Sequence, residues 1–305
     1  MADWLTLSQR RGSRSRRSYE GDHSLFRMTN MKRMQLFEFE DFNWFPRSIR
    51  DNLTRMLSLL HRWLGSTSKI AEILSELVRV SGRHCIVDLC SGDGDLMIEV
   101  QKRLHQIKGM QSVKLELTDL YPNKVARSRI ALQGFQLLSY RDEPLDATAY
   151  RDTTNTAIRT LVSGFHHMNP EQAKAILSAA MAAGDPILIY EISDNSFPPK
   201  YLKYLWWIAL PLNLVFGFFV AAIVRPMTFH HFFFSFILPI IPFCFAWDGA
   251  VSNIRTYTES DLQELLSDLQ SEDYKWSIRK IDAKPSKHLC LVGMPSNPNY
   301  FWRRA

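Results

Sequence analysis

The chain has 305 residues, 46% of them hydrophobic, so it can bury one large core with additions. Its formal charge is +6, but residues 1–34 hold eight Lys or Arg against three acids, and the rest is nearly neutral. The basicity is therefore no evidence for a nucleic-acid groove, and no nucleic-acid partner is expected. The cysteines lack metal-ligand spacing, so we expect free thiols in a reducing compartment and no metal site; they are Cys85, Cys90, Cys244 and Cys290.

The first 34 residues are predicted to be a disordered basic tail, because S-Q-R-R-G-S-R-S-R-R-S contains little that could pack. No apolar stretch follows the arginines, so no secretory signal is expected. Residues 35–82 are predicted to form an N-terminal helical cap. Its first part, F-E-F-E-D-F-N-W-F over residues 37–45, is either an aromatic plug on the core or a lid over a site. Apolar spacing then predicts two helices, over residues 49–64 and about 69–80.

The segment I-V-D-L-C-S-G-D-G, residues 86–94, is typical of a buried parallel strand that turns tightly into a helix. The helix follows over residues 95–104, where Leu96, Val100 and Leu104 share one face. Glycines allow a ligand to approach the backbone closely, and a helix N-terminus offers unpaired N–H groups. The segment therefore predicts a nucleotide-binding turn.

This segment resembles the first motif of the class I S-adenosylmethionine (SAM)-dependent methyltransferases. Asp88, Gly92 and Gly94 match the motif, and Cys90 stands where the family usually has its first glycine. The resemblance implies an α/β, doubly wound, seven-stranded Rossmann-like sheet, with a SAM-binding core over residues 83–198. It also implies that SAM is the cofactor, that both glycines cradle its methionine end, and that Asp88 holds its amino group.

A second strand is predicted over residues 113–120, where V-K-L-E-L-T-D-L alternates with period two. The resemblance implies that Asp119, at its end, accepts hydrogen bonds from the cofactor ribose. A helix to about residue 132 follows, and then a third strand over residues 135–140. In the next turn, Asp146 with Ala147 is preferred over Asp142 as the contact with the cofactor adenine.

A fourth strand is predicted over residues 159–168 and ends in F-H-H-M. Since ligands bind at the carboxyl edge of open α/β sheets, we expect His166 in contact with the substrate. The segment F-H-H-M-N-P-E is similar to the post-strand motif of several small-molecule methyltransferases, which implies that Phe165 lies in the cofactor pocket. His167 is the candidate catalytic residue, as a general base; the alternative is that this segment only marks the cofactor pocket. A helix capped by Asn169 comes next, and a fifth strand follows over residues 186–192.

A hydrophobic insert is predicted over residues 199–249. It contains an uncharged 20-residue run over residues 205–224, long enough to span a bilayer, and a second run over residues 232–247. We expect a membrane-inserted hairpin with transmembrane helices or a re-entrant segment. The alternatives are a hydrophobic substrate cap and an oligomer interface.

The last part, residues 250–305, is predicted to complete the sheet. It contains a helix capped by Thr258 and strands over residues 274–281 and 288–292, of which the last is antiparallel in the resembled fold. Both ends of the insert then lie on one side of any membrane. The Lys and Arg residues around the insert favour the cytoplasmic side, so the expected location is membrane-associated with a cytoplasmic catalytic domain.

Three residues after the insert, Asp248, Arg255 and Tyr257, are predicted to form the substrate mouth, where Arg255 can hold an anionic group. The alternative is anchoring at a membrane interface. The segment W-D-G-x-x-S-N-x-R-T-Y-T resembles an uncharacterised bacterial branch of methyltransferase-like proteins that have such an apolar insert.

Together these patterns predict a SAM-dependent methyltransferase that acts at a membrane on a small-molecule or lipid-like acceptor, without an obligate protein partner. One alternative is a non-catalytic SAM-binding or membrane scaffold protein. The other is an NAD(P)-binding oxidoreductase, which a seven-stranded sheet with a reversed last strand would argue against.

Overall fold

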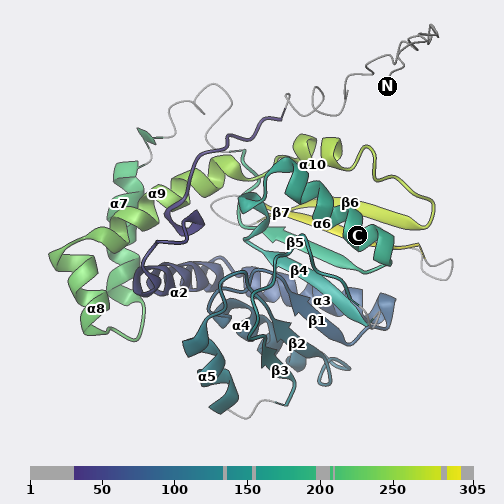
Figure 1. Cartoon of the computed structure of the whole chain (residues 1–305), viewed down its shortest axis with the longest axis horizontal. Helices are drawn as coiled ribbons and strands as arrows, with labels where there is room; N and C mark the ends of the chain where they lie inside the picture. Colours follow the sequence, from purple (N-terminus) through teal and green to yellow (C-terminus); the bar gives the residue numbers. More distant parts are fainter. Residues whose placement is uncertain are drawn as a thin grey trace, which may run out of the picture. The chain divides into compact units, whose positions relative to one another are not determined.

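The computed structural model describes residues 31–132, 136–152, 156–196, 207–208, 210–282 and 287–296 (Figure 1). Residues 1–30 of the predicted basic tail lie outside the described residues. Residues 31–34, which the prediction also assigned to the tail, instead pack on the body of the protein. Arg33 is 9% exposed, and its guanidinium donates to the backbone oxygens of His166, Met168 and Arg255.

One seven-stranded mixed sheet organises the described residues, in the order β3-β2-β1-β4-β5-β7-β6. Strands β1 to β5 pair in parallel, whereas β7 runs antiparallel to both β5 and β6. This arrangement confirms the predicted fold class. The strands are β1 Cys85–Asp88, β2 Lys114–Leu117, β3 Leu138–Tyr140, β4 Ala157–Val162, β5 Ile187–Glu191, β6 Tyr274–Asp282 and β7 Lys287–Pro295.

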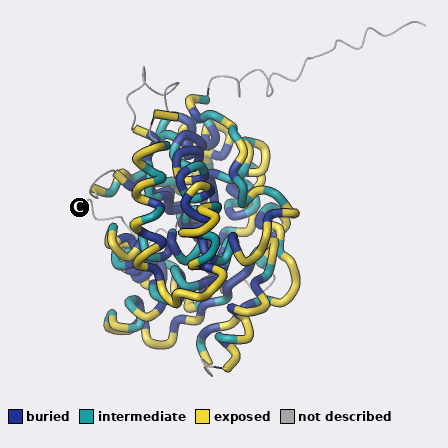
Figure 2. Tube along the Cα trace, turned by 90° about the vertical axis from the view of Figure 1, so that its left-hand side faces the viewer, coloured by how far each residue is buried: buried dark blue, intermediate teal, exposed yellow. Residues whose placement is uncertain are grey.

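Helices cover both sides of the sheet (Figure 1). One side carries α3 (Ser66–Ser81), α4 (Asp95–Gln106) and α5 (Lys124–Leu132), whose apolar residues share one core with the strands. The other side carries α6 (Pro170–Ala183) and α10 (Glu259–Leu265). The central strands β4 and β5 are buried throughout, as parallel strands between helices are. Figure 2 shows the buried residues gathered in the interior and the exposed ones on the outside.

Of the predicted N-terminal cap over residues 35–82, the helix α3 packs on the sheet, whereas the short 3₁₀ helix η2 (Phe39–Asp41) and the helix α2 (Arg47–Trp63) pack beside the insert. The aromatic residues of the segment 37–45 pack on the hydrophobic insert. Phe45 lies in one buried cluster with residues of α2 and the insert, and the rings of Phe39 and Phe243 are 6.3 Å apart. The segment therefore joins the insert to the edge of the sheet.

The described part of the hydrophobic insert contains no helix as long as the predicted 20-residue apolar run. Its first helix, α7, covers only Leu210–Ile223, and residues 197–206 and 209 lie outside the described part. The second run is broken into α8 (Phe229–Phe232), the π-helix η5 (Phe233–Ile237) and α9 (Ile240–Arg255). Among the described helices, none is long and apolar enough to cross a membrane alone. One pair of segments reaches that length and apolarity together, Phe229–Ile237 (α8 with η5) and Ile240–Arg255 (α9), but the two are bent by 75° relative to each other.

Candidate functional site

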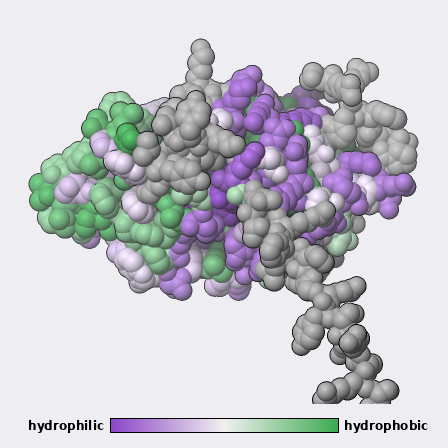
Figure 3. Space-filling view, turned by 90° about the horizontal axis from the view of Figure 1, so that it is seen from above, coloured by the Kyte–Doolittle hydropathy of each residue, from purple (hydrophilic) through white to green (hydrophobic). Residues whose placement is uncertain are grey.

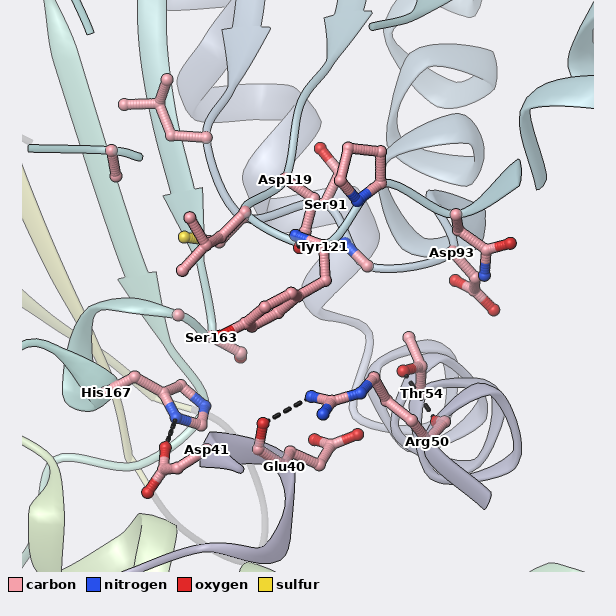
Figure 4. Close-up of a pocket in the computed structure, with 18 of the residues that line it drawn as sticks. Glu40, Asp41, Arg50, Thr54, Ser91, Asp93, Asp119, Tyr121, Ser163 and His167 are labelled. Atoms are coloured by element: carbon pink, nitrogen blue, oxygen red, sulfur yellow. Dashed lines mark hydrogen bonds and ion pairs between the residues drawn. The ribbon is translucent and has the colours of Figure 1, made fainter. Parts of the chain in front are cut away.

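A cavity of about 680 Å³ lies at the carboxyl edge of the parallel strands. This volume is typical of small-molecule sites. The loops after β1, β2, β3 and β4 form one side of the cavity, and the N-terminal segment with α2 forms the other. Figure 4 shows His167 and Asp41 facing each other at one side, Asp93 and Thr54 at the opposite side, and Tyr121 between them.

The glycine turn after β1 lies against this cavity. Gly92 lines it with φ of +57°, and its N–H donates to Asp119 Oδ2 at 2.8 Å. Gly94 is the N-cap of α4 with φ of +77°, and a Cβ there would lie 2.5 Å from Leu117 Cδ1. Any larger residue would therefore displace the turn from the buried end of β2.

Two predicted cofactor contacts at the ends of β2 and β3 line the same cavity. Asp119 binds the turn through Oδ2, as described, and its Oδ1 accepts from the N–H of Tyr121 at 2.8 Å. Asp146 and Ala147 also line the cavity, as does Cys90. The cavity thus brings together five of the predicted cofactor contacts, whereas Gly94, also predicted to cradle the cofactor, does not line it.

Asp88 is placed differently from its predicted role. Its side chain is 1% exposed and does not line the cavity. Its oxygens accept hydrogen bonds from Thr160 Oγ1 at 2.6 Å and Ser91 Oγ at 2.7 Å. Burial raises the pKa of Asp88 to about 6, although these two hydrogen bonds oppose the shift. In this arrangement the carboxyl group supports the turn from behind.

The N-terminal segment contributes charged residues that the sequence analysis did not assign. Glu40, Asp41 and Arg50 all line the cavity. Arg50 Nη2 donates to the Phe42 backbone oxygen at 2.9 Å, and Nη1 bonds to that of Glu40. Oε1 of Glu40 is buried without a hydrogen-bond partner among the described residues, and burial raises the pKa of this carboxyl to about 8. The alternation of aromatic and acidic residues was the available indication of this wall.

The predicted fourth strand ends earlier than expected. Ser163 has φ of +51°, and the chain then forms the 3₁₀ helix η3 (Phe165–His167) in place of further strand. Ser163 lines the cavity, and its hydroxyl lies 2.9 Å from Nε2 of the buried His61. This bond fixes an unfavourable backbone conformation at the cavity wall.

Of the two predicted histidines, only His167 lines the cavity. Its Nδ1 lies 2.9 Å from Asp41 Oδ1. Burial would raise the pKa of Asp41, but hydrogen bonds from His167 and Arg255 hold it well below its usual range. His167 is therefore oriented by a carboxylate that stays ionised.

The other residues predicted for the substrate mouth do not reach the cavity. His166, Asp248, Arg255 and Tyr257 are each at most 7% exposed, and the adjacent Phe165 is also buried. They differ from the prediction because α9 continues to Arg255, which keeps W-D-G-x-x-S-N-x-R on a packed helix. Phe165 packs instead against the ring of Tyr257, 5.2 Å away.

These buried residues form a network behind the cavity wall. Arg255 Nη1 lies 2.6 Å from Asp41 Oδ2 and 3.1 Å from Glu38 Oε1. His166 Nδ1 lies 2.9 Å from Glu191 Oε2. Burial would lower the pKa of His166, but Glu191 and Glu38 raise it to about 10. The network joins η2, η3, β5 and α9.

Comparison with known proteins gives structural matches only. No protein-family model and no curated protein matches the chain. An O-methyltransferase family protein from Burkholderia thailandensis has 14% identity and a TM-score of 0.46, over 90% of this chain and 68% of that one. The plantazolicin methyltransferase BpumL, in complex with SAH, has 11% identity and a TM-score of 0.45, over 81% and 95%.

A third similar structure is the magnesium protoporphyrin IX methyltransferase ChlM from Synechocystis PCC 6803 with bound SAH. It has 12% identity and a TM-score of 0.44, over 75% of this chain and 83% of that one. All three are methyltransferases by their descriptions, and the likeness concerns the fold.

Proposed function

We propose that this protein transfers the methyl group of SAM to a small-molecule acceptor. The observation that carries the proposal is the convergence of three predicted contacts on one cavity: the turn at Gly92, Asp119 at the end of β2 and Asp146 after β3. The antiparallel β7 beside β5 takes the place of the second mononucleotide half that an NAD(P)-binding sheet has. This topology therefore favours SAM over NAD(P) as the cofactor.

The residues of the cavity fit SAM. Gly92 and Gly164 line the cavity without a side chain. A Cβ on Gly164 would lie 2.8 Å from Cys90 Cβ, so glycine allows the loops after β1 and β4 to approach each other here. Asp119 would hold the ribose hydroxyls with the acceptor capacity left beside its two backbone hydrogen bonds. Asp146 and Ala147 would contact the adenine. When bound, SAM supplies an electrophilic methyl group on a sulfonium, so placing the acceptor is the main task of the protein.

The acceptor side of the cavity is then the wall made by the N-terminal segment. It combines the apolar ring of Phe45 with the polar side chains of Glu40 and Arg50, and His167 of η3 lies beside this wall. His167 remains the candidate general base, held in place by Asp41. Such a wall suits an acceptor with an apolar body and a polar reacting group.

A lipophilic acceptor is further supported by the surface of the insert. Phe45 belongs to the buried cluster that includes α7 and α9 residues, so the cavity wall continues into the insert. The outer side of the insert is apolar (Figure 3). We propose that this surface, called here the apolar face, rests on a membrane. Its large exposed residues include Leu212, Val215, Phe219, Phe229, Ile237 and Phe243.

The activity is tested with methyl-labelled SAM and a panel of acceptors, lipophilic and water-soluble, with and without lipid vesicles. We expect labelled product from a lipophilic acceptor, and at least a tenfold loss of the rate in Asp119→Asn. Glu143→Gln changes an exposed acid in the loop after β3 and serves as the control. SAM binding without transfer to any acceptor would support the scaffold alternative. Transfer to water-soluble acceptors alone, without vesicle binding, would contradict the membrane proposal.

A further inference from the structure

The buried network behind the cavity holds three metal-ligating side chains that converge. Glu38 Oε1 lies 3.7 Å from His166 Nε2, and Glu38 Oε2 lies 3.8 Å from His167 Nε2. One ligand atom from each residue can be chosen so that all three lie within 4.8 Å of one another. The two imidazole rings lie side by side, with centroids 4.3 Å apart. The three residues come from two distant parts of the chain.

The other nitrogen of each imidazole is already engaged by a carboxylate. His166 Nδ1 lies 2.9 Å from Glu191 Oε2, and His167 Nδ1 lies 2.9 Å from Asp41 Oδ1. If each Nδ1 carries the proton, both Nε2 atoms present lone pairs toward Glu38. A carboxylate behind each histidine is the usual outer arrangement of metal-binding histidines.

The distances to Glu38 also favour a shared ion over direct bonds. At 3.7 and 3.8 Å, the Nε2 atoms are too far from the carboxylate for hydrogen bonds. Ligand atoms bound about 2 Å from one tetrahedral metal lie roughly 3.3 Å from each other. Small side-chain rotations would therefore bring the three donors into coordination.

The side chains around the histidine pair include more carboxylates than cations, which favours a bound divalent cation. Three carboxylates surround the histidine pair: Glu38, Asp41 and Glu191. Among the described residues, Arg255 is the cation that pairs with two of them. Arg33 donates to backbone oxygens and the Tyr257 hydroxyl, and Ser252 Oγ donates to Glu38 Oε2 at 2.9 Å. With both imidazoles neutral, as ligands of an ion, the three carboxylates and Arg255 leave two negative charges, which one divalent cation would balance.

We propose that Glu38, His166 and His167 bind one divalent first-row transition-metal ion, such as Zn²⁺. Two imidazoles and one carboxylate form a ligand set that suits zinc or ferrous iron. The ion would join the N-terminal segment to η3, and His167 places it next to the cavity. The proposal concerns metal binding and does not depend on methyl transfer, but His167 could not act as the general base while its Nε2 binds the ion.

The test is titration of tag-free, chelator-treated full-length protein with Co²⁺ and Zn²⁺, followed by calorimetry and the visible spectrum of bound Co²⁺. We expect one equivalent to bind, with affinity at least 100-fold weaker in Glu38→Gln and His167→Ala. Glu191→Gln, which alters the residue behind His166, is expected to weaken binding by roughly 10–100-fold. His230→Ala removes an exposed imidazole on α8 and is expected to bind like the wild type.

Two results would overturn the proposal. One is the absence of stoichiometric binding to the wild-type protein, which would leave the histidines as protonated partners of the carboxylates. The other is equal binding by the wild type and both ligand variants, which would place the ion elsewhere. Circular dichroism of each metal-free variant checks that it is folded, and the wild-type titration decides even if a variant is not.

Discussion

At the scale of single residues, Gly94 is the position where the turn depends most on glycine. Its φ of +77° disfavours other residues, and a Cβ would lie 2.5 Å from the side chain of the buried Leu117. Gly109 has φ of +86° but open space around its Cβ position. We predict that Gly94→Ala lowers the free energy of unfolding by about 2–4 kcal/mol and Gly109→Ala by about 1 kcal/mol.

Urea denaturation of both variants measures this difference. Both glycines have positive φ, so the extra loss in Gly94→Ala reports the contact of the turn with Leu117 of β2. Equal losses in the two variants would contradict the packing described for the turn.

Asp88 gives a second prediction at this scale, on pH. Because burial raises its pKa to about 6, from 3.8, folding favours the protonated form. The contribution of Asp88 is thus most favourable below pH 4 and falls by up to about 3 kcal/mol as the pH rises through 6. Relative to the wild type, Asp88→Asn should become more stable by that amount between pH 4 and pH 7.

Urea unfolding at both pH values measures this, with the exposed Asp142→Asn as the control. A relative stability of Asp88→Asn that stays constant with pH, or falls, would show that Asp88 is not buried as described.

At the scale of elements, the insert shows where sequence patterns reach their limit. The helix α6 has the predicted capping box, with Asn169 bonded to Gln172 and Gly184 after its end, because local chemistry alone specifies these contacts. The second apolar run instead bends by 75° between η5 and α9. The bend falls at Leu238 and Pro239, where the proline prevents the helix from continuing. Hydropathy does not report that residues on both sides of the bend then pack against α2.

The apolar face gives a prediction at this scale. Phe229 and Ile237 are 79% and 62% exposed, so their replacement should not affect folding. We predict that the wild type cosediments with vesicles of phosphatidylcholine and phosphatidylglycerol, and that Phe229→Ser with Ile237→Ser weakens binding at least fivefold. Leu132→Ser, on the distant α5 and 88% exposed, is the control. No binding by the wild type, or an equal loss in the control, would contradict the membrane proposal.

At the scale of the whole molecule, the sheet could be predicted because the central strands β1, β4 and β5 are short apolar runs and β2 alternates with period two. The loops that follow β1, β2 and β3 meet at one edge by topology, which is why Gly92, Asp119 and Asp146 share a cavity. The opposite wall could not be predicted in this way. Glu40 and Arg50 reach the cavity because the aromatic segment packs on the insert, a contact between distant parts of the chain.

The placement of the histidines depends on similar long-range contacts. His166 turns inward and His167 outward because Ser163 and Gly164 end β4 and start a 3₁₀ turn. Arg255 was expected at a substrate mouth, yet its partners Glu38 and Asp41 come from a segment more than 200 residues earlier. Sequence spacing holds no information about such pairs.

The central claim is that the cavity binds SAM, and calorimetry of SAM binding tests it most directly. We predict micromolar binding of SAM to the wild type, none of NAD⁺, and at least a 30-fold loss of SAM affinity in Asp119→Asn with Glu143→Gln unchanged. Absence of SAM binding to folded wild-type protein would contradict the methyltransferase proposal.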